Sequence, residues 1–248
     1  MKSEQKTKFT IMFDGTFLHG WQVQKNVPTV QSTVQDALYK IFGERLSVTG
    51  CSRTDAGVHA RNFVCCLDRT VNMENSAFVS AMNANLPDFV RVKEAETADA
   101  AFHPRYSCIG KEYVYNIWNE KYSNPFLKNY AMFYPRFIDI DKISFVGEEL
   151  CGKHDFTSFM AKGSKITDDT VREIKYCKFS KDGGLLKITV CADGFLYNMV
   201  RIIAGTVLYA SQGKIKKGGI AGIIDAKDRN LAGPTAPACG LFLNRVFY

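Results

Sequence analysis

The order of the periodic segments is the feature that most restricts what this 248-residue chain can fold into. In the first hundred or so residues, strand-like alternation and helix-like spacing of apolar residues follow one another as β-α-β-β-α-β. This order is typical of a split β-α-β, ferredoxin-like unit, in which helices pack on an antiparallel sheet. The expected strands are 8–14, 46–50, 62–68 and 89–95, and the expected helices are 29–42 and 76–82.

The second half repeats this order loosely, without convincing sequence identity to the first half. Residues 98–110 are expected to form the crossover between the halves. We therefore predict an α+β protein made of two ferredoxin-like domains, residues 1–105 and 106–248. The expected strands are 112–118, 171–180, 185–192 and 241–247, and the expected helices are 140–151, 195–210 and 220–226.

Composition excludes several other classes of protein. Hydrophobic residues make up 46% of the chain and charged residues 23%, which is ordinary for a globular protein and excludes disorder and fibrous repeats. No stretch approaches the roughly 18 uninterrupted apolar residues of a membrane span, and the polar N-terminus lacks a signal-peptide core. The eight cysteines include no C-x-x-C pair. We therefore expect a cytoplasmic protein, with no membrane partner and with reduced cysteines.

The charge balance fits a nucleic-acid partner but does not demand one. There are 32 Lys and Arg residues against 25 Asp and Glu, a net charge of +7. The densest basic run is only 214–217, Lys-Ile-Lys-Lys. A basic surface must therefore be assembled by folding.

The densest polar cluster is residues 50–60, between two expected strands. Its glycines and small residues let the backbone approach a ligand closely. Arg53 and Asp55 are two positions apart, and a nearby Arg favours the ionised carboxylate. An ionised Asp can serve as nucleophile, base or metal ligand. The alternative is a turn in which Thr54 and Asp55 cap backbone groups.

Two further clusters carry candidate functional groups. Arg201 lies within an apolar helical stripe, where a guanidinium needs a carboxylate or phosphate partner unless it extends from the stripe edge to water. Tyr113 and Tyr115 face one side of an expected strand. They fit either base stacking or a pair of core aromatics.

Cofactor and metal signatures are missing from the sequence. No phosphate-binding G-x-x-x-x-G-K-[ST] or dinucleotide-binding G-x-G-x-x-G motif occurs. No G-x-S-x-G elbow or H-E-x-x-H pair occurs either. The four histidines, His19, His59, His103 and His154, are scattered and suggest structural roles. We therefore expect chemistry that a carboxylate performs without a metal or cofactor.

Residues 53–59, Arg-Thr-Asp-Ala-Gly-Val-His, resemble the R-T-D-A-G-V-H signature of the TruA-type pseudouridine synthases. The resemblance continues through motifs in the same order along nearly the whole chain. These are F-D-G at 13–15, G-W-Q at 20–22, N-A-N-L-P at 83–87, F-H-P-R-Y-S at 102–107, K-E-Y-V-Y at 111–115, H-D-F-T-S-F at 154–159, N-M-V-R at 198–201 and A-G-P-T-A-P at 232–237.

The resemblance implies an isomerase that converts uridine to pseudouridine in the anticodon stem-loop of tRNA, at positions 38, 39 and/or 40. It implies the pseudouridine synthase fold, two ferredoxin-like halves sharing a mainly antiparallel sheet with a central basic cleft. It also implies a homodimer that needs no cofactor or metal, with Asp55 as the catalytic carboxylate. The same resemblance implies six substrate-binding residues. Arg53 is expected to displace the flipped nucleotide, Tyr113 to stack on the uracil and Arg201 to pair with Asp55. Leu241 is expected to line the pocket, and Arg105 and His103 to contact the RNA backbone.

Three alternatives remain open at this stage. A paralogue of the family could modify another RNA site with a similar pocket. A non-catalytic RNA-binding protein could use the same scaffold, although such a protein has no need of a carboxylate facing phosphate. A metal-dependent hydrolase could use Asp55, His59 and other histidines.

Overall fold

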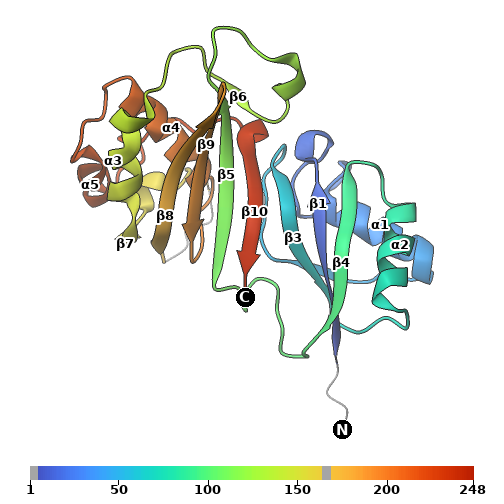
Figure 1. The fold of residues 1–248 in the computed structure, drawn as a ribbon. Coiled ribbons are helices and arrows are strands. Elements are labelled where there is room, and N and C mark those ends of the chain that lie inside the picture. The colour runs from blue at the N-terminus through green and yellow to red at the C-terminus, as the bar shows by residue number, and fades with distance from the viewer. Residues whose placement is uncertain (1–4, 164–168) are drawn as a thin grey trace. The chain divides into compact units, whose positions relative to one another are not determined.

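A computed structural model describes residues 5–163 and 169–248. The chain divides into two compact units, Met1–Ile109 with Phe242–Tyr248, and Gly110–Leu241. Each unit combines helices with a mainly antiparallel sheet (Figure 1), which confirms the predicted α+β class. The predicted boundary between two ferredoxin-like domains, after residue 105, stays a prediction. No helix in the described ranges is long and apolar enough to cross a membrane.

The first unit has the predicted β-α-β-β-α-β order. Its strands pair in the order β4-β1-β3, all antiparallel, with β2 antiparallel to one end of β3. The closing strand β10 runs parallel to the other end of β3, where Phe242 lies opposite His59. The bounds are β1 Lys6–Phe13, α1 Val30–Phe42, β2 Val48–Gly50, β3 His59–Leu67, α2 Asn75–Asn85, β4 Val90–Ala98 and β10 Leu241–Phe247, with a short 3-10 helix η1 at Gly15–Phe17.

Apolar alternation decides which face of this sheet is covered. Phe9, Ile11 and Phe63 are fully buried, and Phe9 meets Phe78 of α2 edge-on at 5.4 Å between ring centroids. Helices α1 and α2 lie against each other at this face (Figure 1). Burial of such side chains contributes about 1.5–3 kcal/mol each. The sheet thereby becomes a rigid base for the loops at the ends of its strands.

Helix α1 begins and ends where the sequence predicts. Thr29 forms a reciprocal capping box with Ser32. The helix ends at Gly43, whose φ of 71° is left-handed. Apolar residues at helical spacing, Val34 and Leu38 among them, are buried. Local sequence and tertiary packing therefore specify the same helix.

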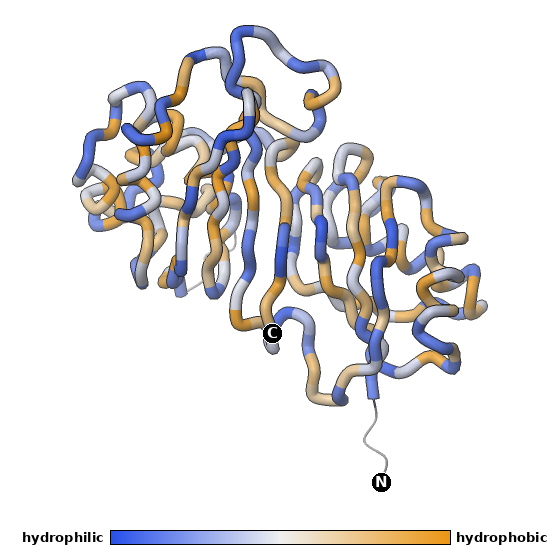
Figure 2. The backbone as a smooth tube through the Cα atoms, viewed as in Figure 1, coloured by the Kyte–Doolittle hydropathy of each residue, from blue (hydrophilic) through white to orange (hydrophobic). Residues whose placement is uncertain are grey.

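The second unit is built on the antiparallel order β5-β9-β8-β7, with β6 parallel to β5. Apolar and polar stretches alternate along its strands (Figure 2), as half-buried strands require. The bounds are β5 Gly110–Trp118, η2 Pro125–Leu127, β6 Met132–Phe133, α3 Ile140–Leu150, β7 Gly152–Asp155, η3 Thr157–Phe159, β8 Val171–Asp182, β9 Leu185–Ala192, α4 Met199–Ser211, α5 Gly219–Ala226 and η4 Ala238–Gly240.

Two features of this unit differ from the sequence prediction. The helix expected over 195–210 begins only at Met199, because Asn198 adopts a left-handed conformation with φ of 60°. Strands β6 and β7 have only 2 and 4 residues. Segments this short show no recognisable alternation and were missed.

Candidate active site

Asp55 lies on the loop 51–58, which connects β2 to β3 in the first unit. Asp55 is half-buried, Arg53 is exposed and Thr54 is buried. A second segment, residues 14–21 after β1, supports this loop through its backbone. The N–H of Trp21 donates to the carbonyl of Thr54 at 3.1 Å, and the N–H of Gly57 donates to the carbonyl of Leu18 at 3.2 Å.

Two glycines permit this close backbone contact. A Cβ on Gly15 would lie 2.1 Å from the carbonyl oxygen of Val58. A Cβ on Gly20 would lie 2.4 Å from that of Thr54, and the φ of Gly20 is +83°. The glycines of the motifs at 13–15 and 20–22 are therefore needed because the Asp55 loop packs directly against their backbone.

His59, the first residue of β3, contacts the segment after β1 directly. Its side chain is only 2% exposed, and its ring stacks on Phe242 at 4.5 Å. Its Nδ1 lies 3.0 Å from the backbone nitrogen of Gly15 and 3.1 Å from Oδ1 of Asp14. These contacts agree with the structural role expected for His59. The spacing of residues in the sequence gives no sign of which groups it contacts.

Thr54 does not play the capping role that the turn alternative gave it. Its hydroxyl oxygen is buried and has no hydrogen-bond partner among the described residues. Such a group carries a desolvation cost of about 1–3 kcal/mol. The loop is therefore held by backbone contacts to residues 14–21, and not by this side chain.

Arg201 is anchored within the second unit by a backbone carbonyl and a side-chain amide. Its Nε donates to the carbonyl of Ala236 at 2.7 Å, and its Nη1 donates to Oδ1 of Asn198 at 2.7 Å. The N–H of Ala236 donates in turn to the carbonyl of Arg201 at 3.1 Å. Arg201 is half-buried, and its guanidinium is held in place by these hydrogen bonds. It therefore does not extend freely from the helix to water.

The segment that holds Arg201 lies directly on the backbone of α4. A Cβ on Gly205 would lie 1.8 Å from the carbonyl oxygen of Pro234. The N–H of Gly233 donates to the hydroxyl of Thr206 at 2.9 Å. The motifs at 198–201 and 232–237 therefore form one structural unit, although about thirty residues separate them.

The two tyrosines of β5 differ in environment. The hydroxyl of Tyr115, which is fully buried, donates to the carbonyl of Pro237 at 2.8 Å, and burial raises the pKa of Tyr115. Tyr115 is therefore a core aromatic. Tyr113 is 6% exposed and meets Phe195 edge-on at 5.1 Å. Leu241, at the start of β10, is also buried.

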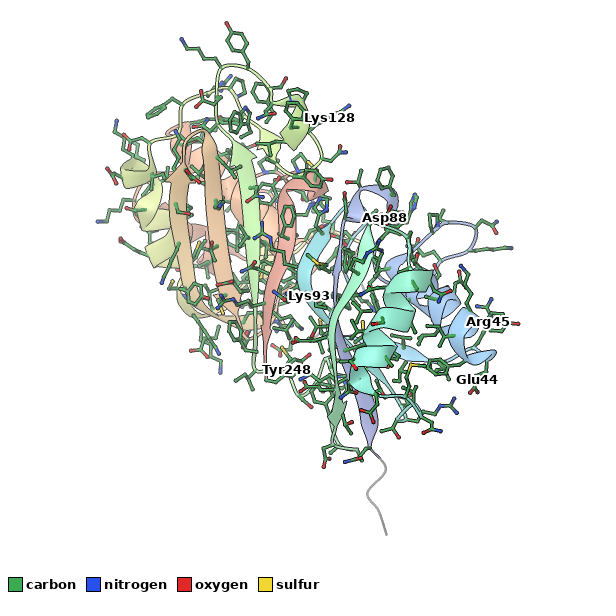
Figure 3. The ribbon with its side chains drawn as sticks, turned by 45° about the vertical axis from the view of Figure 1, so that its right-hand side comes forward. Glu44, Arg45, Asp88, Lys93, Lys128 and Tyr248 are labelled. Atoms are coloured by element: carbon green, nitrogen blue, oxygen red, sulfur yellow. The ribbon has the colours of Figure 1, made fainter. Side chains whose placement is uncertain are left out.

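His103 and Arg105 belong to a turn after β4. Nδ1 of His103 accepts the N–H groups of Arg105 and Tyr106, at 3.1 and 3.2 Å. The hydroxyl of Tyr248, labelled in Figure 3, donates to the carbonyl of Pro104 and ties this turn to the end of the chain. The Arg105 side chain is exposed. His103 thus shapes the turn, and Arg105 is its accessible cation.

Each candidate residue is now placed within one of the two units. Arg53, Asp55, His103 and Arg105 lie in the first unit, and Tyr113, Arg201 and Leu241 lie in the second. The pairing of Arg201 with Asp55 stays a prediction. Within the described ranges, no group of three or more His, Cys, Asp or Glu side chains is arranged to hold a metal ion.

One polar cluster in the second unit was missed by the sequence analysis. Oδ1 of Asp155 accepts the hydroxyls of Thr157 and Thr170, both at 2.6 Å, and its Oδ2 lies 2.7 Å from Nζ of Lys227. Burial favours the neutral acid, but these hydrogen bonds outweigh it and hold the pKa of Asp155 well below its usual range. The cluster joins β7, β8 and the end of α5. Its members are too far apart in sequence for spacing to show it.

The motifs that these contacts explain are also the motifs of a known family. The family model described as tRNA pseudouridine synthase matches residues 10–107 and 147–248. A tRNA pseudouridine synthase A of Ruminiclostridium cellulolyticum is 42% identical over 245 residues, covering 98% of this chain and 100% of that protein. Proteins of the same name from Bacillus pumilus and Clostridium kluyveri are each 40% identical, covering 98% and 97% of this chain and 99% and 98% of theirs. The resemblance seen in the sequence is confirmed, and the chain belongs to the tRNA pseudouridine synthase family.

Proposed function

We propose that this protein isomerises uridine to pseudouridine in tRNA, at position 38, 39 and/or 40 of the anticodon stem-loop, with Asp55 as the catalytic carboxylate. The observation that carries the proposal is the construction of the Asp55 loop. Two glycine contacts and two backbone hydrogen bonds hold the loop that carries the half-buried Asp55 and the exposed Arg53. A carboxylate held in this way is preorganised for reaction with a bound base.

The reaction requires no external oxidant or group donor. The bond between N1 of uracil and C1′ of ribose breaks, and the base turns. A new bond forms between C5 and C1′, the hydrogen of C5 leaves as a proton, and N1 gains a proton. Asp55 acts in this sequence as nucleophile or base.

The other candidate residues take roles in binding the RNA. The target base must leave its stack to reach a carboxylate on a folded loop. The exposed Arg53 suits the space that the base leaves, and the ring of Tyr113 offers a stacking surface for uracil. Arg201, already held by Ala236 and Asn198, supplies a fixed cation for Asp55. Leu241 lines the pocket, and Arg105 and His103 contact the RNA backbone.

We also propose that the enzyme works in the cytoplasm as a homodimer, without metal or cofactor. Its net charge of +7 favours association with the tRNA backbone. The backbone contacts supply affinity and orientation, while the shape of the stem-loop supplies the register.

The test is release of tritium from tRNA labelled at C5 of uridine, with and without EDTA. The label leaves C5 only when the new carbon–carbon bond forms. We expect wild-type protein to release it in both conditions and Asp55→Asn to lose about 10²–10⁴-fold or more of the rate while still binding tRNA. Asp36→Asn, which alters an exposed carboxylate on α1, is the matched control and should match wild type.

Substrates with a single uridine at position 38, 39 or 40 then identify the sites modified. Turnover by Asp55→Asn at the wild-type rate would overturn the assignment of Asp55. Wild-type protein that binds tRNA but releases no label would point to another RNA target or to a non-catalytic RNA-binding protein. Loss of activity in EDTA would instead favour the metal-dependent alternative.

A further inference from the structure

His59 lies four residues after Asp55 but cannot itself touch the substrate. Its side chain is 2% exposed, and one ring face is covered by Phe242 at 4.5 Å. A buried imidazole of this kind is costly unless its nitrogen atoms are bound. Any role of His59 in the reaction must therefore pass through the residues that it contacts.

Those contacts converge on the turn at Asp14 and Gly15. When the ring is neutral at Nδ1, this nitrogen accepts the N–H of Gly15, 3.0 Å away. When Nδ1 carries a proton, it donates to Oδ1 of Asp14, 3.1 Å away. The two states exclude each other, but both bind the ring to the same turn.

The turn at Asp14 and Gly15 also supports the Asp55 loop. Gly15 approaches Val58 so closely that a Cβ would lie 2.1 Å from its carbonyl oxygen. The segment continues to Leu18 and Trp21, which hydrogen-bond Gly57 and Thr54 on either side of Asp55. Displacement of the turn at Gly15 therefore has a direct route to the carboxylate.

We propose that His59 is a positioning residue for Asp55, acting through the Asp14–Gly15 turn. This inference rests on the proposed function. Its physical basis is that misplacement of a reacting group by about 1 Å can cost about 10²-fold in rate. His59 thus supports the catalytic loop through its contacts with Asp14 and Gly15, and the segment 14–21 transmits its effect.

Two substitutions separate the hydrogen bond from the packing. His59→Asn places Oδ1 near the position of Nδ1, so the acceptor for Gly15 is kept while the ring stack is lost. His59→Phe keeps a ring on Phe242 and loses the acceptor. We expect kcat to fall about 10–100-fold in the Phe variant and to be largely restored in the Asn variant. The KM for tRNA should change by less than about threefold, since no RNA contact is removed.

Hydrogen exchange supplies a readout that does not depend on activity. The proposal predicts faster exchange of the 51–58 amides in His59→Phe than in wild type, and near-normal exchange in His59→Asn. Thermal unfolding, with assays run well below the midpoint, shows what fraction of each variant is folded. A Phe variant with wild-type kcat and loop exchange would overturn the proposal, and so would rates that follow only the folded fraction.

The same assays keep this inference distinct from the proposed function. Wild type and Asp55→Asn are measured alongside the His59 variants. An inactive Asp55→Asn beside a fully active His59→Phe leaves the function standing and rejects the positioning role. If wild type releases no label from any tRNA, the proposed function fails. The hydrogen-exchange rates of the 51–58 amides alone then decide whether His59 holds this loop in place.

Discussion

At the scale of single residues, Asp55, the proposed catalytic carboxylate, lies on a loop whose structural supports come from distant parts of the sequence. Asp55 can be recognised from the sequence alone, because a carboxylate in a short loop between two glycines is unusual and the pattern is local. The supports depend on pairings such as Gly15 with His59, which are 44 positions apart. Burial and hydrogen-bond geometry decide such pairings, and neither is contained in local spacing.

Thr54 gives a prediction at this scale. Its buried hydroxyl lacks a partner within the described part of the chain, so Thr54→Val replaces an unsatisfied polar group by a methyl of similar volume. We expect the free energy of unfolding to rise by about 1 kcal/mol. The measurement is urea unfolding of the two proteins at neutral pH.

Thr206→Val is the matched control. The hydroxyl of Thr206 is equally buried but donates to Ile202 at 2.8 Å and accepts from Gly233 at 2.9 Å. Its removal takes away the acceptor of the Gly233 N–H and should cost about 1–3 kcal/mol, whereas the Ile202 carbonyl keeps its place in the hydrogen bonding of helix α4. Equal losses in the two variants would mean that the Thr54 hydroxyl is bonded after all.

At the scale of elements, the sequence predicted the type and order of the long segments and misplaced some ends. Helix α1 was predicted well because its cap and its glycine stop are local signals. The start of α4 was predicted too early because apolar spacing continues through Leu196 into a left-handed turn at Asn198. Apolar spacing gives no sign of that turn, in which Nη1 of Arg201 donates to Oδ1 of Asn198.

The contact of α4 with the 232–237 segment gives the prediction for this scale. Gly→Ala inside a helix normally stabilises by about 0.5–1 kcal/mol. At Gly205, however, the new Cβ would lie 1.8 Å from the Pro234 carbonyl oxygen, a backbone atom that cannot turn aside. We expect Gly205→Ala to destabilise by about 1–3 kcal/mol or more and to loosen Arg201.

Gly222→Ala in α5 tests the same substitution without the contact. Among the described residues, no atom other than those of the adjacent residues and the helix's own backbone lies within 4 Å of the added Cβ at Gly222, so we expect the usual helical gain of about 0.5–1 kcal/mol. Thermal unfolding of both variants provides the comparison. Stabilisation by Gly205→Ala would show that the segment does not lie against α4 as described.

At the scale of the whole molecule, periodicity predicted the α+β class but could not pair distant strands. The strand over 241–247 was expected as the last strand of the second half. In the structure, its residues 242 and 243 pair in parallel with His59 and Ala60 of the first unit. Alternation indicates that a strand exists, but the choice of partner depends on how the whole chain packs.

The pH dependence of unfolding gives the last prediction. The Asp155 cluster joins three elements, and hydrogen bonds from Lys227, Thr157 and Thr170 overcome the effect of burial and hold the pKa of Asp155 well below its ordinary value of about 3.9. Between the folded and unfolded pKa values, the unfolded chain binds more protons at this group. Its contribution to stability is therefore complete above about pH 5 and is lost as the pH falls below about 4.

Urea unfolding of wild type and Asp155→Asn from pH 7 to pH 3 measures this contribution. The variant should be less stable at pH 7. The difference should shrink as the pH falls, because Asp155 takes up a proton in the unfolded wild-type chain while the folded protein keeps the charge, and the variant has no such proton to bind. Thr170→Val removes one of the donors to Asp155 and should give an intermediate difference at pH 7. A gap between wild type and Asp155→Asn that stays constant from pH 7 to pH 3 would show that the charge of Asp155 does not stabilise the fold.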